Sequence, residues 1–309
     1  MSRAPGATVG GQAVIEGVMM RAPHRWAVAV RRPDGVIEAA SHDLPRLSSR
    51  SRWARVPFVR GVLVLGESLS LGFRGLSWSA AKAGTDEDGE VGRYQIAVTM
   101  VLALAFFIAL FVGAPLLAAQ GMKRVWGEST LYFNLVEGVI RLGLFVGYIW
   151  LIGRSKEIRR VFAYHGAEHN TIHAYEAQDP LSLEAIQRYS PRHPRCGTNF
   201  LMIVVLIALV VFTSLPRMPW PWLVASRVVG IPVIAGISYE VLKLGADRRW
   251  LRFLAAPGMW LQALTTRQPE DDQVEVAVAS LLAALDAEER AGVEGRGPIA
   301  AGDLAAEFT

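Results

Sequence analysis

Four long apolar runs, separated by charged connections, dominate the middle of the chain. Residues 95–119, 131–153, 198–215 and 222–242 are each close to the roughly 20 apolar residues that a helix needs to cross a bilayer. Hydrophobic residues make up 52% of the chain, and the mean hydropathy is +0.29. This excess over an ordinary soluble domain predicts a mainly α, polytopic membrane protein with about four transmembrane helices.

The distribution of basic residues predicts the orientation of these helices. Seven Lys or Arg residues lie in the 154–197 connection, against two in 120–130 and one in 216–221. Because basic connections are retained in the cytoplasm, we expect both termini and the 154–197 segment on the cytoplasmic side of the inner membrane. The first residues lack the apolar core of a secretory signal peptide, which agrees with this orientation.

Residues 57–82 are long enough to span a membrane, but their apolar pattern is interrupted by charge. Arg60, Glu67 and Arg74 fall within this stretch, and charges at the bilayer centre are costly. We therefore expect an interfacial or re-entrant amphipathic helix here, followed by an acidic linker. A spanning helix at this point would also move the basic 154–197 segment to the outside of the cell.

A small β element is expected before the membrane part. The β-prone runs 26–30 and 35–39 flank Arg32-Pro33-Asp34-Gly35, a pattern that predicts a β-hairpin. Residues 9–21 carry several glycines between short apolar runs, and we expect a loop there. Glu16 within this loop is an ordinary exposed carboxylate or, alternatively, a substrate-binding residue.

These patterns divide the chain into seven parts. They are an N-terminal cytoplasmic β-containing region (1–56), an interfacial or re-entrant helix with an acidic linker (57–94), a first transmembrane pair (95–153), a cytoplasmic histidine-rich segment (154–197), a second transmembrane pair (198–242), interfacial and amphipathic helices (243–290) and a disordered tail (291–309). The first 60 residues are basic, but they lack the interleaved aromatics of a nucleic-acid motif, so an anionic lipid surface is the expected contact. A single cysteine excludes an internal disulfide.

The histidine-rich segment contains the pattern expected of a metal site. In Tyr164-His165-Gly166-Ala167-Glu168-His169, two histidines lie one helical turn apart with a glutamate beside them. This H-x-x-E-H arrangement lets two imidazoles bind one divalent ion, zinc by preference, while Glu168 acts as a base. Catalytic zinc sites use three protein ligands and leave one position for water.

The third ligand is open at the level of sequence. The candidates are Glu176, Glu240, His193 and Cys196. Glu240 ranks first because an ionisable residue at membrane depth is usually functional, whereas Glu176 lies about 10 Å along the helix from His169. The site also requires the chain to bend near residues 153–155, because a straight helix would carry His165 away from the membrane.

Other readings of the same residues compete with the metal site. Cys196, just before a predicted helix, is a candidate catalytic nucleophile with His193 as its base. Arg195 in the same loop is a candidate substrate-binding residue. Inside the spans, Glu137 with Arg141 and Arg227 predicts a buried ion-pair set in preference to a polar transport pathway.

Five motifs follow one another along the chain: GGQAVIEGVMMR (10–21), YHGAEH (164–169), HPRCGT (193–198), APGMWLQ (256–262) and DDQVE (271–275). Together they resemble the YqhQ-like family of bacterial multi-pass membrane proteins, whose members are described as metal-dependent enzymes of unknown function. The resemblance covers residues 9–280. It implies a location in the bacterial cytoplasmic membrane and a matching residue set of His165, Glu168, His169, His193 and Cys196, but no particular reaction.

Two classes of function are compatible with the sequence. The first is a metal-dependent hydrolase at the cytoplasmic interface, acting on a lipid-linked or membrane-peptide substrate. The alternative is a non-catalytic membrane factor whose interfacial helices dock another membrane complex, an oligomeric partner or the ribosome. A transporter is less favoured, because about four spans without an internal repeat are few for that task.

Overall fold

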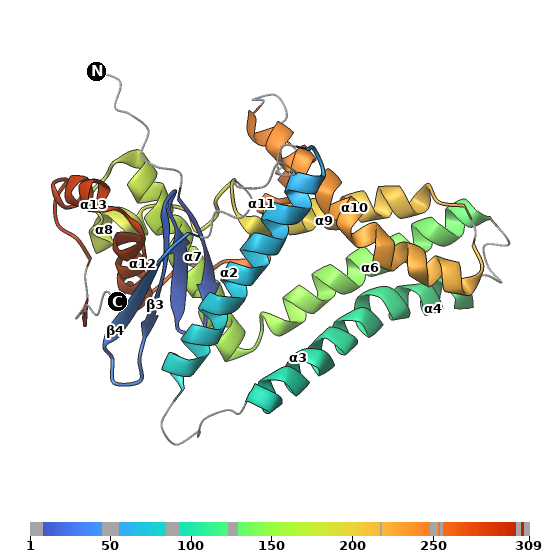
Figure 1. The fold of residues 1–309 in the computed structure, drawn as a ribbon, viewed down its shortest axis with the longest axis horizontal. Helices are drawn as coiled ribbons and strands as arrows, with labels where there is room; N and C mark the ends of the chain where they lie inside the picture. Colours follow the sequence, from blue (N-terminus) through green and yellow to red (C-terminus); the bar gives the residue numbers. More distant parts are fainter. Residues whose placement is uncertain are drawn as a thin grey trace.

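A computed structural model describes residues 9–44, 56–84, 93–122, 129–216, 218–247, 253, 256–300 and 304–305. A β-sheet with its covering helices forms one end of the molecule, and a bundle of long helices extends away from it (Figure 1). Helix α2, Val59–Ala83, runs between these two parts. The class is therefore mainly helical with a small N-terminal antiparallel sheet, as predicted.

Five strands form the sheet in the order β1-β2-β3-β4-β5. They are β1 (Gly10–Val14), β2 (Gly17–Arg21), β3 (Arg25–Arg31), β4 (Ile37–Asp43) and β5 (Leu304–Ala305). The first four strands are antiparallel, and β5 pairs with β4 in parallel. The predicted hairpin is confirmed: Arg31 pairs with Ile37, and Gly35 in the turn has a φ of 87°, which favours glycine.

The prediction of a loop over residues 9–21 is wrong. These residues form the hairpin of β1 and β2, in which Val14 pairs with Gly17 across a two-residue turn. Glycine is unfavourable in strands as a class, which hid the hairpin from the sequence pattern. Gly17 is needed because a Cβ there would run into the backbone of the neighbouring strand β3.

Helices cover both faces of the sheet. Helices α7 (Lys156–Ala177) and α12 (Asp271–Ala284) pack on one face, where Met20, Tyr164 and Leu281 are fully buried. The side chains of Met19 and Val28 point to the opposite face, where they pack with Leu71 of α2. The alternation of strand side chains between two faces thus gives the sheet two hydrophobic cores.

The bundle contains three helices that are long and apolar enough to cross a membrane, namely Val101–Gly121, Thr130–Ile152 and Pro221–Gly245. They correspond to the run α3–η3–α4 (Arg93–Ile108, Ala109–Gly113 and Ala114–Gly121), to α6 (Thr130–Ile152) and to α10 (Trp220–Asp247). Helix α9, Gly197–Thr213, is equally apolar but has only 17 residues. The prediction of a membrane protein therefore stands with three candidate spans and one shorter apolar helix.

Helix α2 links the bundle to the sheet through its glycines. Gly61 lies against Tyr239 of α10, while Gly72 and Gly75 lie against Gln12 of β1 and Met19 of β2. These close contacts explain the recurrence of glycine along this segment. Within the described chain, α2 is a single 25-residue helix and is not one of the candidate spans.

The charged residues of the bundle form the predicted ion-pair set. The Glu137 carboxylate is fully buried and pairs with both Arg141 and Arg227. Arg141 also donates through its Nε to the carbonyl of Phe111, 2.9 Å away, in the π-helical turn η3. A π-helical turn displaces carbonyls from the regular α-helical pattern, so this turn and the ion pairs connect α6 to its neighbours.

The C-terminal region differs from its predicted organisation. The single helix expected to about residue 290 is divided into α12 and α13 (Ala287–Glu294), because Asp286 caps a new helix by accepting from the amide of Glu289. The tail was expected to be disordered, yet Ala300 is buried and donates to the carbonyl of Leu181 over 2.7 Å. Residues 301–303 and 306–309 lie outside the described chain.

Candidate metal centre

Helix α7 carries the two histidines of the H-x-x-E-H motif. The chain breaks between the end of α6 at Ile152 and the start of α7, where Ser155 caps the helix by accepting from the amide of Ile158 over 3.1 Å. This is the bend that the sequence required. Gly166 allows α7 to pack closely against the backbone at Arg267, because a Cβ at this position would collide with the Arg267 carbonyl oxygen.

Three side chains from two parts of the chain meet above this helix. His165, His169 and Cys196 each offer one ligand atom, and these atoms lie within 4.8 Å of one another. The His165 Nε2 is 3.1 Å from the Cys196 Sγ, and the rings of His165 and His169 are 4.4 Å apart. Ligand atoms around one tetrahedral zinc ion are roughly 3.3–3.8 Å apart. The widest separation in the cluster would therefore have to shorten by roughly 1 Å, and His165 and Cys196 would have to move slightly apart, to enclose an ion.

The hydrogen bonds of the two histidines at Nδ1 direct the Nε2 atoms towards the cluster. The His165 Nδ1 lies 2.9 Å from the carbonyl of Thr265, and the His169 Nδ1 lies 2.7 Å from the carbonyl of Pro191. A carbonyl only accepts, so each Nδ1 carries the proton and each Nε2 keeps a lone pair. The Nε2 of His169 is buried and has no hydrogen-bond partner among the described residues.

Burial keeps these groups in a neutral form. Desolvation, helped by the nearby His165, lowers the pKa of His169 to about 2. Desolvation also raises the pKa of the Cys196 thiol, although the amide and hydroxyl of Thr198 oppose this effect. Cys196 caps helix α9, and its Sγ accepts from the Thr198 amide over 3.4 Å. A positive charge in the cluster would therefore stabilise the thiolate that burial disfavours.

Glu168 lies beside the cluster as the sequence predicted. Its side chain is 4% exposed, and one carboxylate oxygen has no hydrogen-bond partner within the described part of the chain. Desolvation raises the pKa of Glu168 to about 8, against the opposing influence of His165 and the amide of Gly11. The carboxylate lies directly over strand β1, because a Cβ on Gly11 would be 3.2 Å from the Glu168 Cδ.

Gln262, which the sequence analysis did not single out, holds the loop that carries Cys196. It lies on α11, Ala256–Thr265, and is fully buried. It accepts from the His193 amide over 2.8 Å, donates to the His193 carbonyl over 2.9 Å, and donates to the Asn199 Oδ1 over 3.0 Å. The motif 256–262 was visible in the sequence as part of the family resemblance, and that was the available signal for this residue.

His193 lies next to the cluster and is not one of its three converging donors. Its ring centre is 5.7 Å from that of His169, and burial lowers its pKa to about 4. Its Nδ1 accepts from the amide of Arg195 over 3.2 Å, which directs its Nε2 to Glu176, 3.6 Å away. The ring centre of His173 lies 4.5 Å from that of His193.

Arg195 is half exposed at the edge of this group and pairs with Glu176. The same carboxylate contacts His193, so Glu176 links the loop to α7 and does not join His165 and His169.

Glu240, the first-ranked third ligand, is placed elsewhere. Its carboxylate pairs with Arg60 of α2 and accepts from the amide of Phe58 over 3.3 Å. The structure brings Cys196 to the two histidines in its place. The reason is that α10 packs against α2 at this level, so Glu240 neutralises an arginine of its neighbouring helix.

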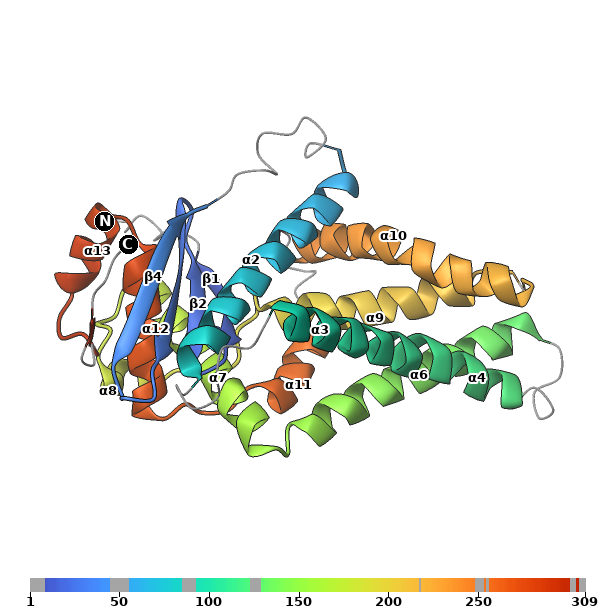
Figure 2. The same cartoon turned by 60° about the horizontal axis from the view of Figure 1, so that its bottom comes forward.

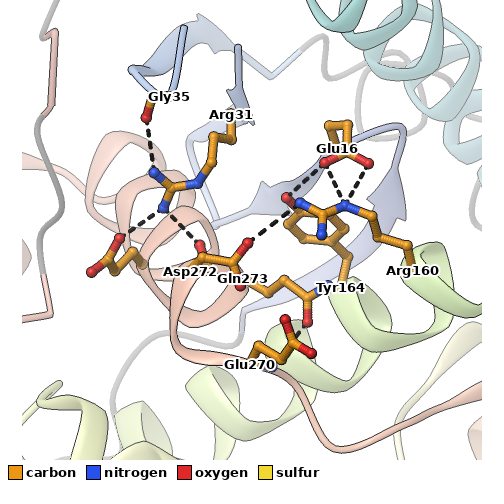
Figure 3. A network of polar contacts seen from close by, with 9 residues as sticks. Glu16, Arg31, Gly35, Arg160, Tyr164, Glu270, Asp272 and Gln273 are labelled. Carbon is orange, nitrogen blue, oxygen red and sulfur yellow. Dashed lines mark hydrogen bonds and ion pairs between the residues drawn. The ribbon is translucent and has the colours of Figure 1, made fainter. Parts of the chain in front are cut away.

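Glu16 is held in a network of ion pairs (Figure 3). Its carboxylate oxygens both accept from the Arg160 Nε at 2.7 Å, and one accepts from the Tyr164 hydroxyl at 3.3 Å. Arg160 also reaches Asp272 on α12, 3.3 Å away. Glu16 has a φ of 51°, an unusual conformation for a non-glycine residue. Glu16 therefore connects the β1–β2 turn to α7. It is not a free exposed carboxylate, and it is not part of the histidine cluster.

The comparisons with known proteins place the chain in a family without assigning an activity. The family model described as "Protein of unknown function (DUF1385)" matches residues 56–287. The chain is 35% identical over 287 residues to "Uncharacterized protein YqhQ" of Bacillus subtilis (strain 168), covering 88% of this chain and 90% of that relative. No solved structure matches the chain. The chain therefore belongs to the YqhQ-like family of proteins of unknown function, DUF1385.

Proposed function

We propose that this protein is a membrane-bound, metal-dependent hydrolase. Its metal ligands would be the Nε2 atoms of His165 and His169 and the Sγ of Cys196, and Glu168 would be its base. The observation that carries this proposal is the convergence of three donor atoms in which both imidazoles are already held by their Nδ1 atoms. A nitrogen and sulfur donor set of this kind favours zinc among the common divalent ions.

The surroundings of the three donors support the same proposal. A buried imidazole nitrogen without a partner is costly in a protein interior, and an ion would satisfy it. Three protein ligands leave one position open for water, as in catalytic zinc sites. A structural site would be closed by a fourth ligand, and no other His, Cys, Asp or Glu of the described chain joins the cluster.

Each residue has a defined part in this chemistry. A bound divalent ion would supply Lewis-acid activation of water and of the carbonyl group under attack. A bound cation beside Glu168 would oppose the desolvation that raises its pKa and leave the carboxylate ionised. Its free oxygen would then take the proton from water and return it to the leaving group. The carbonyls of Thr265 and Pro191 would orient the two imidazoles, and Gln262 would hold the loop that delivers Cys196.

The site would act on the cytoplasmic face of the inner membrane. The end of α6 and the start of α9, which flank the segment carrying the site, lie at the same end of the bundle as the sheet (Figure 1). This segment contains seven Lys or Arg residues, and basic connections are retained in the cytoplasm. In this arrangement α9 would cross as a fourth, short span, and both termini would be cytoplasmic. The substrate would then be lipid-linked or a membrane peptide.

Metal analysis of the purified protein tests the proposal. We expect one zinc ion per chain in the detergent-solubilised wild type and a loss of most of it in His169→Ala, while the matched control His173→Ala retains the metal. Glu168→Gln should also retain the metal. In a strain lacking the gene, complemented by wild type or by Glu168→Gln, mass spectrometry of membrane peptides and lipids should detect a cleavage product with the wild type alone.

Two results would contradict the proposal in different ways. Wild-type protein with no more metal than His169→Ala would exclude a metal centre. A metal-loaded Glu168→Gln variant that restores every cellular property would instead favour the non-catalytic membrane factor.

The contact of 3.1 Å between Cys196 and His165 also fits a cysteine nucleophile with His165 as base. That chemistry predicts product formation that survives removal of the metal by a chelator.

A further inference from the structure

The free edge of the sheet lies at the candidate site. Strand β1 is the first strand of the sheet order and has β2 as its one strand neighbour in the described chain. Figure 2 shows β1 on the side of the sheet that faces the helix bundle, with β4 on the far side. A strand edge presents unpaired backbone N–H and C=O groups, which bind another extended chain.

The strand register identifies the groups that this edge presents. Val14 and Gly17 close a two-residue hairpin turn and therefore form a hydrogen-bonded pair. Hydrogen-bonded and non-hydrogen-bonded pairs alternate along an antiparallel ladder. Gly11 and Ala13 are consequently in non-hydrogen-bonded pairs with Met20 and Val18. Their N–H and C=O groups point away from β2, towards the free edge.

The same edge meets the proposed base. The Glu168 carboxylate lies over Gly11, where a Cβ would be 3.2 Å from its Cδ. Gly10 and Gly11 are both exposed, and a Cβ on Gly10 would meet nothing within 4 Å. Natural edge strands are usually protected by lysine, proline or a covering element, but the sequence GGQAV of β1 contains neither residue. The Gly11 amide meets the Glu168 carboxylate, so the outward groups that remain for a ligand in the described part of β1 are the carbonyl of Gly11 and the amide and carbonyl of Ala13.

We propose that the free edge of β1 binds the substrate as an added β-strand, so the substrate is an extended polypeptide segment. This inference rests on the proposed hydrolase function and selects the membrane-peptide substrate class over the lipid-linked class. Alternating amide donors and acceptors match an extended peptide backbone, and a lipid chain has no groups to pair with them. A peptide paired with Ala13 would lie two residues along β1 from Gly11, which the Glu168 carboxylate contacts.

The reaction at this position is the addition of water to a peptide bond. The water oxygen joins the carbonyl carbon, and the bond between carbon and nitrogen breaks. Glu168 takes the proton released by water and passes it to the leaving amine, so no oxidant or reductant is needed. Cleavage would require an unfolded or extended segment at the edge. In a helical segment the backbone N–H and C=O groups are already hydrogen-bonded to one another and cannot pair with β1.

Hydroxamate probes test the inference on the zinc-loaded, detergent-solubilised full chain. The first probe is acetohydroxamic acid, which binds only the metal. The second is the peptide hydroxamate Ac-Val-Ala-Val-Ala-NHOH, and the third is its depsipeptide analogue, in which two backbone amides are replaced by esters. We expect the peptide to bind about tenfold or more tightly than the depsipeptide, because the ester lacks the N–H donor.

A variant of β1 provides the second arm. Ala13→Pro removes the outward N–H without removing a hydrogen bond to β2, and proline is tolerated at strand edges. It should weaken the peptide hydroxamate about tenfold, while Ala13→Ser, which keeps the amide, should not. Acetohydroxamic acid should bind all three proteins equally.

The outcomes separate the two proposals. If acetohydroxamic acid binds but the peptide and depsipeptide bind equally, the β1 inference is wrong and the metal centre remains. If neither acetohydroxamic acid nor zinc binds the wild type, the proposed function fails and the inference fails with it. Because the depsipeptide comparison uses wild-type protein, it decides the question even if Ala13→Pro does not fold.

Discussion

Gln262→Leu removes the polar group that holds the Cys196 loop while keeping a similar side-chain volume. The substitution leaves the amide and carbonyl of His193 and the Oδ1 of Asn199 without partners in a buried site. An unsatisfied buried polar group costs about 1–3 kcal/mol. Because three groups are affected and the loop can relax, we expect a loss of about 3–5 kcal/mol in the free energy of unfolding.

The same substitution should weaken metal binding through the loop. Residues that orient metal ligands typically change metal affinity by about 10–100-fold when they are lost. Thermal unfolding of the detergent-solubilised protein would measure the stability, and competition with a chromophoric chelator would measure the zinc affinity. Gln268→Leu is the matched control, since the side-chain hydrogen bonds of Gln268 in the described part of the chain go to Gln187 at the surface. If both variants unfold alike and bind zinc alike, the reasoning about Gln262 is refuted.

Two further substitutions test the packing of the helices. Gly166→Ala should destabilise the protein by about 1–3 kcal/mol, because the new Cβ collides with the carbonyl of Arg267. Gly121→Ala, whose Cβ meets nothing within 4 Å, should not, and equal melting temperatures would disprove the close contact. Glu137→Gln leaves two paired arginines without their counter-charge and should cost about 3–5 kcal/mol. Exposed Glu294→Gln is its control, and a similar small effect of both variants would show that the bundle tolerates the unpaired arginines.

Helix α2 shows how much of a segment's structure a local sequence pattern can predict. The sequence shows recurring glycines and three charges in residues 57–82, which is enough to predict a helix that differs from the spans. The partners of those glycines on α10, β1 and β2 are more than 50 residues away in the chain. Contacts of this kind leave no periodic signal in one sequence, so the role of α2 as a connection between the sheet and the bundle emerged only from the fold.

Strand β1 shows where a prediction from local propensity fails. Its glycines oppose a strand on propensity alone, yet they suit the position because Gly11 must accommodate the Glu168 carboxylate and Gly17 must accommodate β3. Local propensity is a weak guide where neighbouring elements approach this closely. The loop predicted for residues 9–21 was an error of this kind.

The sequence by itself determined the apolar helices, the β3–β4 hairpin and the pairing of His165 with His169, because each depends on spacing within one or two turns of chain. The tertiary structure alone decided that Cys196, and not Glu240, lies with the two histidines, that Gln262 holds the Cys196 loop, and that Glu168 lies against Gly11 of β1. Those choices depend on where α9, α10 and α11 pack. That packing follows from side-chain complementarity between distant segments, which spacing along the chain does not encode.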